Sequence, residues 1–114
     1  MGAGIVRIVT DASFERDVLG AGRPVLVAFG ASWCRPCHLM SSGLRALAAM
    51  QRDRLLVAKL DVDDSPATAD LYGVETFPMC ILFRDGKEIA RLDGYLPLRK
   101  IEALLQPHFA PVES

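Results

Sequence analysis

The chain has 114 residues, which fits one domain with a single hydrophobic core. Its composition, 51% hydrophobic and 24% charged, is that of an ordinary globular protein and excludes wholesale disorder. Its formal net charge is −1 and no basic run occurs, which excludes the electrostatic footprint of a nucleic-acid-binding protein. We therefore expect one folded domain over residues 1–114 without a nucleic-acid partner.

The N-terminal residues and the cysteines indicate in which cellular compartment the protein is expected. Residues 1–11 lack a basic start, an apolar core and a cleavage site, so we expect no signal peptide. The apolar runs at 24–31 and 77–83 are far shorter than the roughly 20 residues that span a bilayer. Three cysteines, two of them close together, do not form the disulfide framework of a secreted domain. We expect a monomeric cytoplasmic protein with no membrane partner.

The first elements follow from β-branched and apolar runs. Residues 5–9 predict a short strand, and Thr10 and Asp11 offer an N-cap for a helix over residues 14–19. Residues 25–29 are apolar at every position, which is typical of a central strand covered on both faces.

A long amphipathic helix is predicted next. Apolar residues recur at helical spacing from Cys34 to residues 52–53, and residues 41–43 are expected to bend this helix. Residues 55–60 then form a strongly apolar strand in which Lys59 is the only charge.

The remaining elements are bounded by capping and turn residues. Ser65 and Pro66 are a serine N-cap and a first-turn proline, and Gly73 stops the short helix that they start. The last segments are two strands at 79–83 and 88–92, joined by a turn at 85–86, and a helix from Pro97 that Pro107 is expected to disrupt. Alternating β and α elements predict an α/β fold, a central mixed sheet flanked by helices on both faces.

Cys34 and Cys37 lie where the central strand meets the long helix. Residues three apart on a helix have Cβ atoms roughly 5–6 Å apart, so the two sulfurs can form a disulfide. Helix N-terminal N–H groups favour a thiolate at Cys34, with Arg35 adding positive charge and Pro36 fixing the first turn. Cys37, one turn inside, is expected to be the buried sulfur. We expect Cys34 to attack a disulfide of a client protein and Cys37 to resolve the mixed disulfide.

With its Trp-Cys-x-Pro-Cys signature at residues 33–37, the sequence resembles the thioredoxin family over nearly its whole length. The other supporting segments are 10–14, 25–33, 58–63, 72–74, 77–78 and 83–86. The resemblance implies a thioredoxin fold and a protein-disulfide reductase with no cofactor besides its own disulfide. It also implies an NADPH-dependent thioredoxin reductase as electron donor.

The resemblance further implies a peptide-binding groove beside the cysteines. Pro78 is expected to follow a cis peptide bond and to face them. The residues expected to frame the groove around a client's disulfide are Trp33, Val62, Thr76, Phe77, Gly94 and Tyr95.

The sequence departs from the family pattern behind the site. Ala28 replaces a buried aspartate that is thought to take the proton from the resolving cysteine, while its partner Lys59 remains. An apolar environment favours the neutral form of an unpaired lysine, so Lys59 or a nearby water is expected to assist Cys37. Gly30 stands where an aromatic residue is common and Ser42 where a helix-kinking proline is common, which indicates looser packing.

Several alternatives remain open from the sequence. The cysteine pair could be half of a zinc site, with only His38 and Cys80 nearby as further ligands, although His38 is expected to point away from Cys37. Cys80 is read as a small core residue rather than a regulatory thiol. Trp33 could belong to the core rather than the docking surface, and Lys59 could simply extend into solvent. The competing function is a binding or assembly module with little redox turnover.

Overall fold

The computed structural model describes residues 4–109, so the outermost residues of the expected domain, 1–3 and 110–114, lie outside the described part. The elements in chain order are β1 (Val6–Ile8), η1 (Glu15–Leu19), β2 (Val25–Gly30), α1 (Arg35–Met50), β3 (Leu56–Asp61), α2 (Pro66–Leu71), β4 (Met79–Arg84), β5 (Lys87–Asp93) and α3 (Leu98–Phe109). Within residues 4–109, no helix has both the length and the apolar content needed to cross a bilayer.

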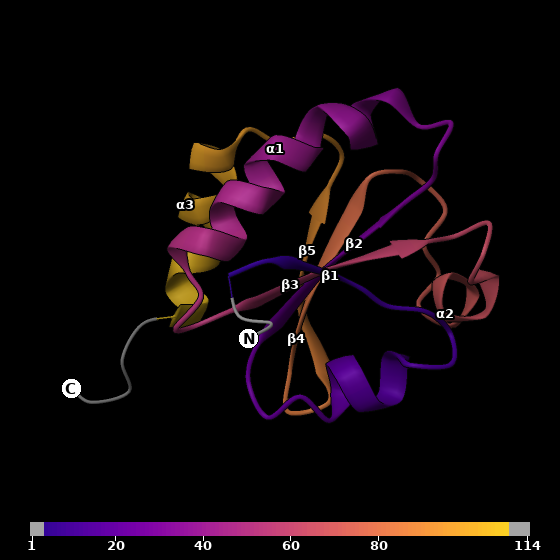
Figure 1. Ribbon diagram of the computed structural model, residues 1–114, viewed down its shortest axis with the longest axis horizontal. Helices are drawn as coiled ribbons and strands as arrows, with labels where there is room; N and C mark the ends of the chain where they lie inside the picture. Colours follow the sequence, from indigo (N-terminus) through magenta and orange to yellow (C-terminus); the bar gives the residue numbers. More distant parts are fainter. Residues whose placement is uncertain (1–3, 110–114) are drawn as a thin grey trace.

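Five strands form one mixed sheet in the order β1-β3-β2-β4-β5. The strands β1, β3 and β2 run parallel, while β4 is antiparallel to both β2 and β5. Helices α1 and α3 lie together on one side of the sheet, and α2 and η1 lie on the other (Figure 1). The predicted α/β architecture is therefore confirmed.

Strand β2 is the centre of the sheet, as its unbroken apolar sequence predicts. Val27 and Phe29 pack into the cluster on the η1 and α2 side, whereas Leu26 and Ala28 pack into the cluster beneath α1 and α3. Because successive side chains alternate between faces, Ala28 and Gly30 both face α1. The two smallest residues of β2 therefore lie on the same face as the helix that carries the cysteine pair.

The capping prediction is right for Thr10, whose hydroxyl accepts the Ser13 N–H at 3.3 Å in the turn before η1, but it assigned Asp11 to the wrong helix. Asp11 accepts hydrogen bonds from the backbone N–H groups of Ala67 and Thr68, at 3.1 and 2.8 Å, so it caps α2. Ser65 is at the predicted N-cap position, but its hydroxyl accepts a hydrogen bond from the Asp11 N–H at 3.1 Å. The hydrogen bond from the Thr68 side chain is the main reason that the pKa of Asp11 is lowered.

Three further boundary predictions differ from the structure. The predicted first helix is a single π-helical turn, η1. Helix α1 ends at Met50, before the predicted end at residues 52–53; it is continuous through residues 41–43, where the expected bend stays a prediction. Helix α3 continues past Pro107, since a proline this close to a helix end removes little hydrogen bonding, and Arg84 donates to the carbonyl oxygen of His108 at 3.0 Å.

Candidate active site

The cysteine pair lies at the N-terminus of α1. Cys34 is the N-cap residue, with Arg35 and Pro36 in the first turn. A disulfide joins Cys34 and Cys37, whose Cα atoms are 5.3 Å apart, and the Cys37 N–H donates to the Cys34 Sγ at 3.2 Å. A helix N-terminus stabilises negative charge, so Cys34 has the environment that favours a thiolate.

The expected order of burial of the two sulfurs is reversed. Cys34 is only 4% exposed and belongs to the same buried cluster as Phe29 and Val62, whereas Cys37 is half-buried. The expectation failed because helical position alone does not determine burial. Exposure of Cys37 depends on the side chains that β2 presents to it, and these are unusually small.

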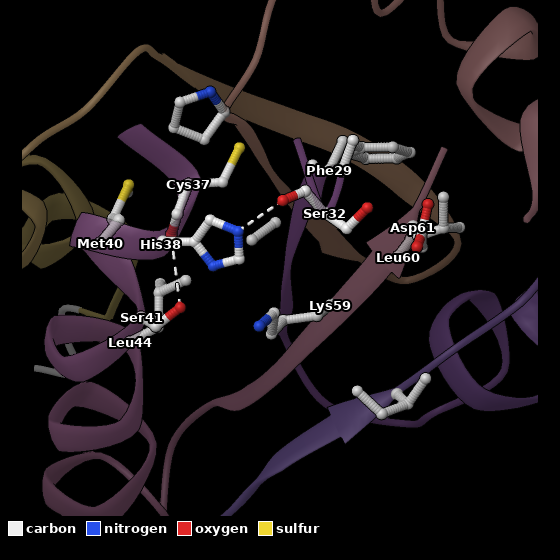
Figure 2. A pocket seen from close by; sticks show the side chains of 15 residues that line it. Phe29, Ser32, Cys37, His38, Met40, Ser41, Leu44, Lys59, Leu60 and Asp61 are labelled. Atoms are coloured by element: carbon white, nitrogen blue, oxygen red, sulfur yellow. Dashed lines mark hydrogen bonds between the residues drawn. The ribbon is translucent and has the colours of Figure 1, made fainter. Parts of the chain in front are cut away.

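A cavity of about 350 Å³ lies behind Cys37 (Figure 2). It is bounded by α1, β2, β3, Ile8 of β1 and Pro78, and Cys34 is not among its lining residues. Ala28, Phe29 and Gly30 line it from β2, and the two small residues face α1. A Cβ atom on Gly30 would lie 2.9 Å from the Cys37 Sγ, so glycine permits this close approach of strand and disulfide.

Lys59 lies beside Ala28 in the parallel register of β2 and β3, and it lines the cavity. Its side chain extends from β3 toward α1 (Figure 2). The expected apolar environment is wrong, because Lys59 is an exposed residue at the mouth of the cavity. The missing side chain at Ala28 leaves open space where an ion-pair partner stands in the family pattern.

His38 lines the cavity as well, and its expected orientation away from Cys37 stays a prediction. Its ring Nε2 lies 2.6 Å from the carbonyl oxygen of Ser32, and it lines the same cavity as Cys37 (Figure 2). The hydrogen bond to Ser32 turns the ring back toward the strand.

Pro78 lines the cavity as well, and the Phe77–Pro78 peptide bond is cis, as expected. The backbone N–H of Gly94 donates to the Pro78 carbonyl oxygen at 2.9 Å. The left-handed conformation of Gly94, with φ of 83°, favours glycine there. The residue that follows β5 therefore supports the proline loop.

The expected groove residues are brought together only in part. Trp33 and Phe77 pack edge to face with ring centroids 5.8 Å apart, and the Thr76 hydroxyl donates to Asp93 at 3.2 Å. Val62 is only 9% exposed and offers little contact surface. Tyr95 is 48% exposed and lines a separate surface depression between α1 and the start of α3.

Trp33 is a surface residue, which excludes the core alternative for it. The indole is 63% exposed, and its Nε1–H donates to Asp63 at 2.8 Å. Sequence reasoning missed Asp63, because no local pattern shows that a loop residue after β3 reaches the indole. The sequence did contain one signal for Asp63, an acidic residue just beyond the end of a predicted parallel strand. The loops that follow parallel strands converge at one edge of the sheet, where Trp33 also lies.

Cys80 is fully buried in β4, where its register partner on β2 is Ala28. Burial raises the pKa of its thiol to about 12, which makes it a core residue rather than a reactive thiol. Among residues 4–109, no three His, Cys, Asp or Glu side chains gather in a way that could hold a metal ion.

The geometry of the site defines a class of protein. A disulfide at a helix N-terminus, with a cis proline and an exposed tryptophan beside it, is a site for thiol–disulfide exchange.

The comparisons then give the family. The thioredoxin family model matches residues 5–107. Thioredoxin from Alicyclobacillus acidocaldarius is 41% identical over 97 residues, which cover 85% of this chain and 91% of that protein. Thioredoxin from Mycolicibacterium smegmatis is 49% identical over 88 residues, covering 75% and 79%. The chain belongs to the thioredoxin family, and it is a thiol–disulfide oxidoreductase, a protein-disulfide reductase.

One relative carries the similar region within a much longer protein. The bifunctional thioredoxin reductase/thioredoxin of Mycobacterium leprae is 47% identical over 92 residues, which cover 81% of this chain and 20% of that protein.

Proposed function

We propose that Cys34 and Cys37 are the catalytic residues and that residues 1–114 act as one thioredoxin-like domain. The Cys34 thiolate attacks a disulfide of a client protein, releases one client thiolate and forms a mixed disulfide. Cys37 then attacks the Cys34 sulfur, releases the client as a dithiol and forms the Cys34–Cys37 disulfide. Two electrons pass to the client in each cycle.

The observation that carries this assignment is the position of Cys34 as the N-cap of α1. The Cys37 N–H that donates to its sulfur at 3.2 Å stabilises the thiolate of the reduced protein. Trp33, Phe77 and the cis proline Pro78 form the docking surface for the client, and Thr76 and Gly94 extend it. Arg35 adds positive charge beside Cys34, and Pro36 fixes the first helical turn.

The resolving step needs a proton acceptor for Cys37. Ala28 cannot serve, and Lys59 is exposed at the cavity mouth. We therefore assign Lys59 an electrostatic role in which its ammonium group favours the Cys37 thiolate while a cavity water takes the proton. The cavity that Cys37 and Lys59 share supports this assignment.

The electron donor that we propose is an NADPH-dependent thioredoxin reductase. The relative that joins a thioredoxin reductase and a thioredoxin in one chain supports this pairing. We further propose that the protein acts as a monomer in the cytoplasm, in a reducing environment that regenerates the dithiol, with its own disulfide as its only redox group.

An insulin-disulfide reduction assay tests the assignment. We expect turnover by the wild type with NADPH and a bacterial thioredoxin reductase, and its loss to the uncatalysed rate in Cys34→Ser. Cys80→Ala serves as the matched control, since it removes a cysteine that is fully buried and outside the disulfide. No turnover above the uncatalysed rate in either the wild type or Cys34→Ser would instead identify a binding module.

A further inference from the structure

The two sulfurs of the disulfide differ in which molecules can reach them. Cys37 lines the 350 Å³ cavity behind the site, whereas Cys34 is 4% exposed and lies outside it. A cavity of this size accommodates a small organic molecule but no protein segment with its side chains. A compact reactant can therefore reach Cys37 by a route that is closed to a client protein.

The leaving group also favours attack at Cys37. In thiol–disulfide exchange, the sulfur that leaves faster is the one whose thiolate is more stable. Attack at Cys37 releases Cys34, which receives the Cys37 N–H at the helix N-terminus. Attack at Cys34 would release Cys37 one turn inside the helix, without that hydrogen bond.

The charges at the cavity mouth select the reactant. Lys59 forms no ion pair within residues 4–109, where the recorded pairs are Arg16–Asp17 and Arg91–Glu88. Asp61 also lines the cavity and keeps its negative charge, but its Oδ1 accepts the N–H groups of residues 63 and 64 in its own turn, and it lies on the far side of Lys59 from α1 (Figure 2). His38 and Ser41 add polar groups from α1 (Figure 2). The unpaired ammonium of Lys59 therefore favours an acidic group on the reactant.

We propose that this cavity is a second entry to the redox site, for low-molecular-weight thiols that carry a carboxylate or sulfonate. The thiolate of the first small thiol attacks the Cys37 sulfur, the Cys34–Cys37 bond breaks, and Cys34 leaves as a thiolate. A second small thiolate attacks the sulfur of the bound small thiol, which yields its symmetrical disulfide and the Cys37 thiolate, and water protonates Cys37. Two small thiols are oxidised and the protein disulfide is reduced.

This inference rests on the proposed redox role of the Cys34–Cys37 disulfide, but its test is independent of client turnover. The oxidised wild type is mixed with 2-mercaptoethanesulfonate, quenched in acid within milliseconds to seconds, alkylated and mapped by fragment-ion mass spectrometry. We expect the first adduct predominantly on Cys37, about tenfold over Cys34, because leaving-group stability and access act in the same direction. An adduct predominantly on Cys34 overturns the proposal, whereas absent insulin turnover overturns only the proposed function.

Filling the cavity tests the route. We expect Ala28→Leu to slow disulfide reduction by 2-mercaptoethanesulfonate about tenfold, since the reacting atoms no longer reach one another, with Trp33 fluorescence as the readout. Ala49→Leu on the exposed face of α1 is the matched control and should keep the wild-type rate. Should Ala28→Leu fail to fold by circular dichroism, Ser41→Leu fills the same cavity from α1. An unchanged rate in a folded, filled variant overturns the route.

Exchanging one charge tests the selectivity. Rates with 2-mercaptoethanesulfonate and with neutral 2-mercaptoethanol are each divided by the thiolate concentration. We expect their ratio to fall about threefold in Lys59→Gln, as for one partly screened charge near a surface. Lys100→Gln, an exposed lysine on α3, is the control and should keep the ratio. A ratio that Lys59→Gln leaves unchanged overturns the preference for acidic thiols.

Discussion

On one face of the sheet, Phe14, Tyr72 and Phe83 pack ring against ring, with centroids 5.1 to 5.8 Å apart. On the opposite face, Ala28 and Gly30 leave a cavity of about 350 Å³ beneath α1. The same strand, β2, contributes to both faces. One face is filled by large side chains, while the other is left open directly behind the resolving cysteine.

This difference separates the roles of the two cysteines. Cys34 belongs to the well-packed cluster and lies beside the aromatic docking residues, whereas Cys37 faces the open side. Tight packing holds the attacking sulfur at the helix N-terminus. Cys37 faces the cavity on the open side, and in the proposed mechanism a cavity water there takes the role of the acid that the family pattern places at Ala28.

The largest expected effect comes from removing the sulfur on the open side. Cys37→Ser should accumulate the mixed disulfide between Cys34 and a client, because resolution then requires a second external thiol. Turnover in the insulin assay should fall at least about 100-fold, as expected when one member of a catalytic pair is lost. Non-reducing gels and intact mass measure the trapped complex, and a variant with wild-type turnover would contradict the assigned roles.

Restoring an acid on the open face should speed the resolving step. In Ala28→Asp, the new carboxylate lies beside Lys59 in the strand register and can take the Cys37 proton. We expect resolution of a preformed mixed disulfide to accelerate about tenfold, at the low end of general base catalysis because water already serves in the wild type. Stopped-flow fluorescence gives the rate, and Ala28→Asn is the uncharged control. An unchanged rate and pH profile would contradict the role of the cavity water.

A smaller effect is expected from closing the contact between β2 and the disulfide. In Gly30→Ala, the new Cβ would lie 2.9 Å from the Cys37 Sγ, so the oxidised form should lose about 1–3 kcal/mol of stability. The reduced form should lose less, since a free Cys37 side chain can rotate away. Urea unfolding of both forms measures the difference.

Gly43→Ala provides the control for this substitution. Its new Cβ would lie 3.7 Å from Leu98, an ordinary contact, and it stands within α1. Both redox forms should gain about 0.5–1 kcal/mol, because alanine is the better helix former. Equal losses in the two forms of Gly30→Ala would show that the strain is not at the disulfide.

The smallest effect concerns the cap on the packed face. The pKa of Asp11 is lowered, chiefly by its hydrogen bond from the Thr68 side chain, so its charged form is the more favourable one in the folded protein. The charged Asp11 side chain therefore stabilises the folded protein at pH values above the ordinary carboxyl pKa near 4. This stabilisation is lost as the pH falls through the lower pKa that Asp11 has in the folded protein. The melting-temperature advantage of the wild type over Asp11→Asn should therefore shrink in acid, with Asp53→Asn as the control for charge. An advantage that grows in acid would contradict the capping assignment.

Much of the fold could be predicted because local patterns matched the final environment. The apolar run of β2, the helical spacing of α1 and the turn at residues 85–86 each agree with the structure. The predictions failed where a side chain that we expected to hydrogen-bond to its neighbours in sequence instead bonds to a residue far away in the sequence. Asp11 caps α2 rather than the next helix, because the long chain segment between them folds back to bring Thr68 within 2.8 Å.

The sequence by itself determined the redox chemistry. The spacing of Cys34 and Cys37 at a strand-to-helix junction requires the two sulfurs to be near each other and places Cys34 at a helix N-terminus, since both follow from local backbone geometry. Tertiary structure alone decided which sulfur is accessible. Burial depends on side chains that arrive from other strands, and here Ala28, Gly30 and Lys59 open the space behind Cys37.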